Sequence, residues 1–502
     1  MIKREHWKTR FGFLMAAIGS AIGLGNIWRF NYVCYTNGGG AFLIPYIIAL
    51  FTAGIPLLIL EFGLGQHMQG SAPQSFSKIS KRWEWLGWWP IVFSMFGILL
   101  YYSVVISWAL SYFVYSFGLK WGSNPNTYFF QDYLKISSGP WQIKGVVVPI
   151  VISLAAIWLI NWIICYKGIH KGIEKACRIF MPVLFILAGV LVIRGVTLPG
   201  ALSGINWYLK PSFSSLLKPE VWIAAYGQIF FSLSIAFGIM IAYASYLPRE
   251  SDIVNNGFIT GLANSGFSFF VGFAVFSTLG YMSFTTGAPF NQVVTQGLGL
   301  AFVTFPQAIG EIPLLPQLFG IIFFLCLIIA GLSSSISLLE AFAAALIDKM
   351  GIPRHKTITF LVIFGFLGGI IFTTRAGLFW LDIVDHYILS YALVLVGLLE
   401  CVVIGWIFGS GRMREWINEF SDFKIGKWWE MSIKVIIPVI LSVILVLNII
   451  KELKGPYEDY PASALILIGF GWLVATLIGA LILNYKSRRK RITNNQISKM
   501  TN

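Results

Sequence analysis

Apolar segments long enough to cross a lipid bilayer dominate this sequence and decide what it can fold into. Because a helix rises about 1.5 Å per residue, roughly 20 apolar residues span the hydrocarbon core of a membrane. Twelve such segments follow one another, at residues 11–36, 41–68, 87–117, 146–165, 174–195, 221–247, 256–284, 315–347, 358–374, 377–408, 431–450 and 462–484. The polar connections between them are short, which leaves no room for a separate soluble domain. The sequence therefore predicts an all-α polytopic membrane protein with twelve transmembrane helices.

Composition excludes several other classes of protein. Only 11% of the 502 residues are charged and 57% are hydrophobic, whereas a soluble domain is roughly a quarter charged. The net charge of +15 does not indicate nucleic-acid binding, because the cations lie in short loops rather than on one face or arm. The five histidines and five cysteines form no nucleophile or metal-ligand set, so an enzyme is not expected.

The distribution of lysine and arginine predicts how the chain is oriented in the membrane. With the N-terminus in the cytoplasm, 25 of the 36 cations lie on the cytoplasmic side, 8 lie outside and 3 lie within spans. This is a strong positive-inside bias. Twelve crossings place both termini in the cytoplasm, and residues 486–502 form a basic tail that we expect to contact anionic membrane lipid. The expected location is the cell inner membrane.

Two spans are interrupted at matching depths. The first contains GSAIGLGN at 19–26, and the sixth, five spans later, contains FFSLSIAFG at 230–238. Because five is odd, a five-helix repeat enters the membrane in the opposite orientation the second time. Broken helices at matching places in two inverted halves are typical of a transporter site near the midplane, although small residues also serve close helix packing. The predicted organisation is 1–195 and 196–409 as inverted repeats, 286–312 as an extracellular lid, and 410–485 as two further spans.

An unwound turn in a membrane exposes backbone groups of both signs. The N–H groups at a half-helix start suit a carboxylate, and the C=O groups at a half-helix end suit a cation or an ammonium group. A zwitterionic amino acid matches both ends. Neutral oxygen donors surround the two breaks: Asn26, Ser232, Ser234, Asn264, Ser333 and Ser334. Since a divalent cation usually takes several carboxylates and none lies here, Na⁺ is the expected ion.

Ionisable side chains within spans are costly and are therefore candidates for function. Arg29 and Asp385 are expected to close the site from outside, and Arg4 with Asp348 from the cytoplasmic side. Three glutamates remain, namely Glu61, Glu340 and Glu400. All three are expected to form structural hydrogen bonds with broken backbone, with proton coupling through Glu61 or Glu400 as the alternative.

Four stretches carry a resemblance to a known family. They are REHWKTRFGFLMAAIGSAIGLGNIWRF, NGGGAFLIPY, GQIFFSLSIAFGIMIAYASYL and AGLSSSISLLE. Together they resemble the sodium:neurotransmitter symporter family, especially its bacterial amino acid members, from Arg4 to about Gly409. The resemblance implies a leucine-transporter-type fold, with a 5+5 inverted repeat in which helices 1 and 6 are broken. It also implies Na⁺-coupled import of an amino acid by alternating access.

The resemblance further implies which residues bind. One sodium site would comprise Ala21, Asn26, Ser232 and Asn264, completed by the substrate carboxylate. A second would comprise the carbonyls of Gly19, Ile22 and Ala330 with the hydroxyls of Ser333 and Ser334. The substrate would meet Ala21, Gly25, Ile98, Tyr102, Phe231, Ser232, Ser234, Phe237 and Leu338. Closure would bring Arg29, Asp385 and Phe237 over the site, and inward release would break a network of Arg4, Ser245, Tyr246 and Asp348.

Four positions refine this expectation. Gly23 stands where amine-transporting relatives carry Asp, which favours an α-amino acid, and the apolar pocket favours a hydrophobic or aromatic one. Ser268 stands where some bacterial members carry an acidic residue; with Tyr46, Gln228 and Ser232 it would form a chloride site, so chloride dependence stays open with a slight preference for an anion site. Gly172 and Pro182 resemble a motif whose unwinding wets the inner sodium site. Asn31 stands where the family usually has Pro.

Some questions stay open at this point. A proton-coupled amino acid transporter is the alternative, with Glu61 or Glu400 as the proton carrier, and an ion channel is a more remote one. The sequence settles neither the amino acid carried, the number of Na⁺ ions nor the oligomeric state.

Overall fold

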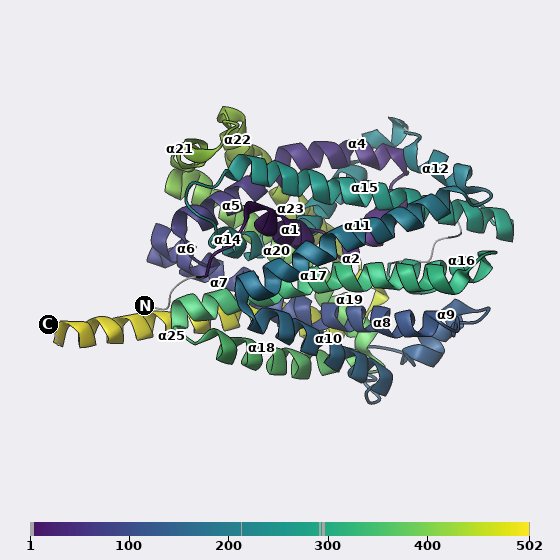
Figure 1. Ribbon diagram of the computed structural model, residues 1–502. Helices are drawn as coiled ribbons and strands as arrows, with labels where there is room; N and C mark the ends of the chain where they lie inside the picture. The colour runs from purple at the N-terminus through teal and green to yellow at the C-terminus, as the bar shows by residue number, and fades with distance from the viewer. Residues whose placement is uncertain (1–4, 212, 291–292, 294–296, 501–502) are drawn as a thin grey trace.

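Helices lying side by side form a single bundle (Figure 1). The computed structural model describes residues 5–211, 213–290, 293 and 297–500. Both ends of the described chain lie at the same end of the bundle, and the C-terminal helix extends beyond it there. The described residues contain one isolated antiparallel bridge, between Val146 and Thr374, and otherwise helices, turns and loops.

Within the part of the chain that the structure describes, ten helical segments are individually long and apolar enough to cross a membrane. π-helical turns join the labelled helices that share one segment. The ten segments are built from α4 (Gly40–Ala49) with α5 (Ile55–Met68), α7 (Glu84–Phe93) with α8 (Leu100–Ser116), α10 (Val148–Tyr166), α11 (Lys175–Val196), α15 (Ile253–Thr286), α17 (Pro316–Met350), α18 (Arg354–Gly369), α19 (Gly377–Tyr387) with α20 (Leu393–Val402) and α21 (Ser410–Phe420), α22 (Lys427–Met431) with α23 (Ile437–Lys454), and α24 (Ala462–Ala464) with α25 (Gly471–Met500). Short helices in the connections are α6 (Ala72–Ile79), α9 (Pro125–Thr127), α12 (Ala201–Leu209) and α16 (Phe305–Glu311).

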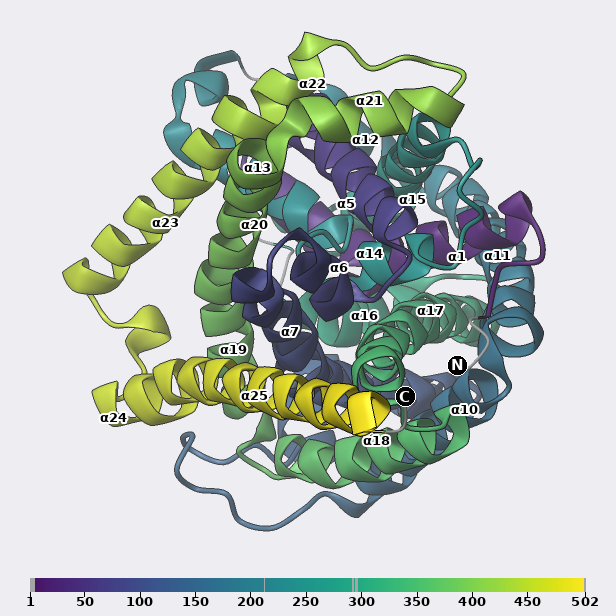
Figure 2. The same cartoon turned by 90° about the vertical axis from the view of Figure 1, so that its left-hand side faces the viewer.

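The first and sixth apolar segments are broken, as the sequence predicts. The first divides into α1 (Arg10–Ala21), α2 (Leu24–Ile27) and α3 (Arg29–Thr36), and its two halves are bent by 64°. The sixth divides into α13 (Pro219–Ser232) and α14 (Ile239–Ala244), each too short to span alone. Viewed along the bundle, α14 lies near its centre, α1 lies between α14 and α11, and α23 and α24 lie at its edge (Figure 2). The breaks are thus enclosed by protein, the only place where unwound backbone is tolerated in a membrane.

The tenth span is longer than predicted. The sequence ends its apolar run at residue 408, but the helix continues to Phe420 over 44 residues. The extension, α21, is amphipathic: Met413 and Ile417 are buried, whereas Arg412 and Glu415 are exposed. Hydropathy alone cannot detect such an extension, because only one face of it is apolar.

The predicted lid segment packs into the bundle at its C-terminal part. Residues 300–304 form a π-helical turn that leads into α16, and all five are buried. The ring of Phe302 stacks on Phe129 at 5.3 Å between centroids and meets Trp108 edge-on at 5.8 Å. These aromatic contacts join the segment to α8 and to the turn after α9.

Candidate substrate and ion site

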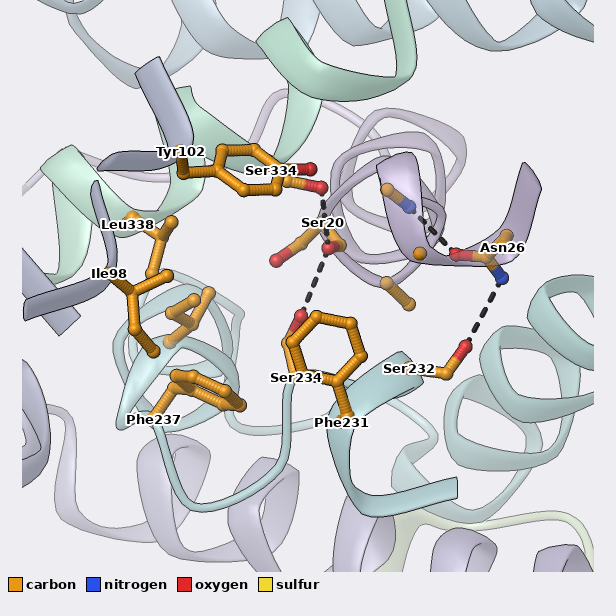
Figure 3. Close-up of a pocket in the computed structure, with 14 residues that line it drawn as sticks. Ser20, Asn26, Ile98, Tyr102, Phe231, Ser232, Ser234, Phe237, Ser334 and Leu338 are labelled. Carbon is orange, nitrogen blue, oxygen red and sulfur yellow. Dashed lines mark hydrogen bonds between the residues drawn. The ribbon is translucent and has the colours of Figure 1, made fainter. Parts of the chain in front are cut away.

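A cavity lies where the two broken segments meet (Figure 3). Its walls are Ser20, Ala21, Gly23, Gly25, Asn26, Ile98, Tyr102, Phe231, Ser232, Ser234, Phe237, Ile239, Ser334 and Leu338. All nine residues predicted to meet the substrate are among them. Ser20, Gly23 and Ile239 also line the cavity and were not predicted as substrate contacts.

The backbone carbonyl of Ser20 joins three elements at the break. It accepts hydrogen bonds from the hydroxyls of Ser234 at 3.0 Å and Ser334 at 3.1 Å, as Figure 3 shows. Ser234 belongs to the sixth segment and Ser334 to α17. Because α1 ends at Ala21, the carbonyl of Ser20 lacks the partner a continuous helix would provide, and the two hydroxyls replace it. The glycine-rich run at 19–26 indicates the break, but only the packing identifies Ser20.

The side chains predicted for the first sodium site form one hydrogen-bonded cluster. Asn26 Nδ2 lies 3.1 Å from Ser232 Oγ, 2.8 Å from Asn264 Oδ1 and 2.8 Å from Ser268 Oγ. Asn264 Nδ2 donates to Ser232 Oγ at 2.9 Å. Three segments, α2, α13 and α15, thus bring neutral oxygen atoms together. Ala21, the fourth predicted member, lines the adjoining cavity.

The second predicted sodium set also lies together. Ser333 Oγ is 2.9 Å from the carbonyl oxygen of Ala330 and 3.5 Å from that of Ile22. A Cβ added to Gly19 would lie 3.3 Å from Ser333 Cβ, so the end of α1 and the middle of α17 are in contact here. Among the described residues, no group of three or more His, Cys, Asp or Glu side chains could hold a metal ion. The available donors are hydroxyls and carbonyls, which fit a monovalent hard cation.

The cavity is polar at one end and apolar at the other. At the polar end the hydroxyl of Tyr102 accepts the backbone N–H of Leu24 at 3.1 Å. A Cβ at Gly23 would lie 2.8 Å from both Ser334 Oγ and Tyr102 Oη, so a side chain at this position would require these groups to move. Ile98, Phe237 and Leu338 form the opposite wall in Figure 3. A ligand with one charged end and an apolar side chain matches this shape.

A buried glutamate holds the break of the sixth segment. Ser234 and Ala236 have φ of 53° and 64°, a left-handed conformation that costs a non-glycine residue roughly 1–2 kcal/mol. Glu61 on α5 is fully buried, and its Oε1 accepts the backbone N–H of Ala236 at 2.6 Å. The predicted structural role of Glu61, hydrogen bonding to broken backbone, therefore has a specific partner. Glu400 on α20 is also buried, and its Oε1 has no hydrogen-bond partner among the described residues.

On one side of the cavity, Arg29 packs on an aromatic ring. Its guanidinium carbon lies 4.2 Å from the ring centroid of Phe231. The aromatic expected to close the site, Phe237, also lines the cavity and packs edge-on against Phe93 at 6.2 Å between centroids. Arg29 and Asp385 lie close enough to interact electrostatically, and Asp385 accepts a hydrogen bond from the hydroxyl of Tyr101.

Three members of the predicted inner network also bond residues outside that network. Tyr246 donates its hydroxyl to Glu340 Oε1 at 2.9 Å, and Ser245 donates to the carbonyl of Ala242. Asp348 Oδ2 accepts the backbone N–H of Ser71 at 2.8 Å. Glu340 forms a buried ion pair with Arg354 at 2.6 Å. The fourth predicted member, Arg4, lies outside the described residues.

The residues predicted to bind chloride lie on three neighbouring helices. Gln228 and Ser232 are four residues apart on α13 and so share a face. Tyr46 on α4 donates its hydroxyl to Ser265 at 3.2 Å, and Ser268 follows Ser265 by three residues on α15. Gln228 is 2% exposed, and neither its Oε1 nor its Nε2 has a hydrogen-bond partner among the described residues. A buried amide donor without a partner fits an anion.

Gly172 and Pro182 lie in a continuous helical segment. Gly172 belongs to the π-helical turn Ile169–Glu174, and Pro182 lies within α11. A Cβ at Gly172 would lie 2.0 Å from the carbonyl oxygen of Ile164, so only glycine allows this approach to α10. In this structure the segment is wound.

The sequence is similar to those of known transporters along most of its length. Residues 4–135 and 120–489 match the sodium:neurotransmitter symporter family. An uncharacterized sodium-dependent transporter of Methanocaldococcus jannaschii is 48% identical over 476 residues, covering 95% of this chain and 96% of the relative. A sodium- and chloride-dependent taurine transporter of Canis lupus familiaris is 33% identical, covering 94% and 82% of the two chains. A sodium- and chloride-dependent GABA transporter 2 of Mus musculus is 34% identical, covering 84% and 76%. The chain is a sodium-dependent symporter that belongs to the sodium:neurotransmitter symporter family.

Proposed function

We propose that this protein imports an α-amino acid with a hydrophobic or aromatic side chain, driven by the Na⁺ gradient. The observation that carries the proposal is the cavity between the two broken segments, polar at Tyr102 and apolar at Ile98, Phe237 and Leu338. Gly23 leaves no carboxylate at the polar end, so the substrate brings its own anionic group. The amides of Ala21 and Gly25 with the Tyr102 hydroxyl would hold the carboxylate. Carbonyls of Ala21, Phe231 and Ser232 would hold the ammonium.

Na⁺ transport and substrate transport would be coupled because the substrate carboxylate would also be a ligand of one Na⁺. The oxygens of Asn26, Ser232 and Asn264 would bind one Na⁺, and the substrate carboxylate would complete its shell. Ion and substrate therefore stabilise each other, and neither is carried efficiently alone. A second Na⁺ would lie among Gly19, Ile22, Ala330, Ser333 and Ser334. Its ligands join α1 to α17, so its departure would free α1 to move.

An anion next to the first sodium site is part of the proposal. The unpartnered amide of Gln228, with Tyr46, Ser232 and Ser268, would bind Cl⁻. The mammalian relatives named above are described as chloride-dependent, which supports this assignment. A negative charge here would balance the Na⁺ ions in a site that otherwise lacks carboxylates.

Alternating access would move the two repeats, 1–195 and 196–409, relative to each other. Arg29, Asp385 and Phe237 would close the outer route, with Phe231 under the Arg29 guanidinium and the segment 286–312 as a lid. Arg4, Ser245, Tyr246 and Asp348 would close the inner one. The positive-inside bias and the shared position of both chain ends support an inner-membrane protein with cytoplasmic termini.

Uptake in reconstituted vesicles tests the proposal. Radiolabelled leucine, tryptophan, taurine and GABA are each offered with Na⁺, with K⁺ replacing Na⁺, and with gluconate replacing Cl⁻. The expected result is saturable accumulation of leucine or tryptophan that disappears without Na⁺ and weakens without Cl⁻. Ser268→Glu, which places a fixed negative charge at the anion site, should transport without Cl⁻.

Other outcomes identify the competing functions. A preference for taurine or GABA would contradict the proposed substrate class but not the proposed ion sites. Uptake driven by a pH gradient and indifferent to Na⁺ would overturn both sodium sites and make Glu61 and Glu400 the residues to test. Current that does not saturate with substrate would indicate a channel.

A further inference from the structure

One side-chain hydroxyl in the wall of the cavity has no hydrogen-bond partner. Ser20 is 1% exposed and lines the cavity, and its Oγ has no partner among the described residues. The other polar side chains of the wall each form at least one hydrogen bond, namely those of Asn26, Tyr102, Ser232, Ser234 and Ser334. Because buried polar groups in folded proteins almost always have a partner, this exception requires an explanation.

The hydroxyl of Ser20 does not bond its own helix. Serines on membrane helices commonly donate to the carbonyl one turn earlier, as Ser337 on α17 does toward Ser333 at 2.9 Å. Within the described part of the chain, Ser20 Oγ forms no such bond, although Ser20 lies in the last turn of α1. Figure 3 shows this hydroxyl pointing toward the part of the cavity bounded by Ile98 and Leu338. It is therefore available to a ligand in the cavity.

The part of the cavity that this hydroxyl faces is otherwise apolar. The side chains there carry no polar atom and are those of Ile98, Phe237, Ile239 and Leu338. The backbone carbonyl of Ser20 already accepts two hydroxyls, from Ser234 and Ser334. A substrate side chain that enters this region thus meets one side-chain group that can donate or accept a hydrogen bond, the Ser20 hydroxyl.

We propose that Ser20 is a specificity-determining residue, whose hydroxyl hydrogen bonds an N–H or O–H group on an aromatic substrate side chain. Tryptophan and tyrosine carry such a group, whereas leucine and phenylalanine leave the hydroxyl unpaired. A site with a buried polar group discriminates against ligands that cannot pair with it. One neutral hydrogen bond corresponds to roughly a 3- to 10-fold difference in affinity. The inference rests on the proposed function, because it selects among the amino acids proposed there.

Equilibrium binding of matched ligand pairs tests this role. The full-length protein in detergent, at saturating Na⁺, is titrated with tryptophan and with β-benzothienylalanine, in which sulfur replaces the ring N–H. Tyrosine and phenylalanine form the second pair, and leucine is the reference ligand. Each pair is measured in the wild type, in Ser20→Ala and in Ser103→Ala. Ser103 is the matched control, because its hydroxyl is also buried and without a partner among the described residues but does not line the cavity.

The role of the hydroxyl predicts a preference that one substitution removes. In at least one pair, the wild type and Ser103→Ala should bind the member with the N–H or O–H roughly 3- to 10-fold more tightly. Ser20→Ala should bind both members of that pair equally, and its affinity for leucine should not fall. The substitution keeps the backbone carbonyl that Ser234 and Ser334 bond, so the lost preference reports on the hydroxyl alone. A purely structural role would change the affinities of both members alike.

Several results would overturn the inference. Equal binding within both pairs by the wild type would show that the hydroxyl does not contact the substrate side chain, and an unchanged preference in Ser20→Ala would assign it to another group. Leucine binding that neither tryptophan nor tyrosine competes away would exclude the side chains named here. Thermal unfolding without ligand checks that Ser20→Ala folds, and Ser20→Gly carries the test if it does not.

The same titrations separate this inference from the proposed function. Leucine binding that requires Na⁺, without a preference within either pair, would refute the role of Ser20 alone. Absence of Na⁺-dependent binding by every amino acid would refute the proposed function and this inference with it.

Discussion

Removing the hydroxyl of Tyr102 tests the central assignment of the substrate pocket. The hydroxyl accepts the N–H of Leu24 at 3.1 Å and lies at the polar end of the cavity, where its own hydrogen is available to a carboxylate. Tyr102→Phe leaves the buried Leu24 N–H without an acceptor, at a cost of about 1–3 kcal/mol. That cost falls on the free and the bound protein alike, so it lowers stability and cancels from the binding constant.

The binding penalty comes from the substrate contact alone. A hydrogen bond to a charged group contributes about 1.5–3 kcal/mol, and each 1.4 kcal/mol corresponds to a tenfold change in affinity. Tyr102→Phe should therefore weaken equilibrium binding roughly 10- to 100-fold at saturating Na⁺. For the carboxamide analogue of the same amino acid, the hydrogen bond is uncharged and the penalty should fall to about 0.5–1.5 kcal/mol.

The assay is equilibrium binding of the radiolabelled amino acid that the uptake panel selects, with the carboxamide as competitor. Tyr115→Phe, on the outer part of the same helix, is the matched control and should bind as the wild type does. Binding by Tyr102→Phe within threefold of wild type would refute the assignment of the carboxylate to this hydroxyl. An equal loss for acid and carboxamide would mean that the variant disturbs the cavity as a whole.

Three further substitutions give separate predictions. Asn31 Nδ2 donates to the carbonyl of Ile27 at 2.8 Å beside the break, so Asn31→Leu should raise the Na⁺ concentration for half-maximal uptake about fivefold. The control is Thr36→Val, which removes a similar side-chain-to-carbonyl hydrogen bond farther along α3 and should leave that Na⁺ concentration unchanged. Gly172→Ala would place a Cβ 2.0 Å from the carbonyl oxygen of Ile164. Thermal unfolding should show that the free energy of unfolding falls by about 1–3 kcal/mol. Glu340→Gln removes the buried carboxylate that pairs with Arg354. Chemical denaturation should show that the free energy of unfolding falls by about 3–5 kcal/mol. An unchanged unfolding midpoint would contradict a stabilising role for this ion pair.

Much of the fold was predictable because its determinants are local in the sequence. Bilayer thickness fixes the length of an apolar run, and glycine-rich or polar interruptions at 19–26 and 230–238 mark the places where a helix cannot continue. The extension of the tenth helix to Phe420 was missed, because an amphipathic helix lying partly outside an apolar environment has no hydropathy signal along its whole length. The neutral oxygen donors around the two breaks followed from the residues, the remaining candidate site residues came from resemblance, and in the structure the described members of the predicted sets lie close together.

What the sequence could not supply was which atoms face one another. Phe231 and Phe237 are six residues apart on the same broken segment, and only the left-handed turn at Ser234 and Ala236 decides which ring lies under Arg29. Nothing in the sequence distinguishes the carbonyl of Ser20 from other backbone carbonyls. Its role at the break is visible only in the structure, where the hydroxyls of Ser234 and Ser334 donate to it.

The sequence by itself determined that the chain crosses a membrane, which segments do so, and which two must break. Those outcomes depend on the transfer of side chains and backbone groups out of water, a property of each segment alone. The tertiary structure decided the cavity and the hydrogen-bond partners of the breaks. Hydrogen bonds act over about 3 Å, so their partners are set only when packing brings segments far apart in the sequence into contact.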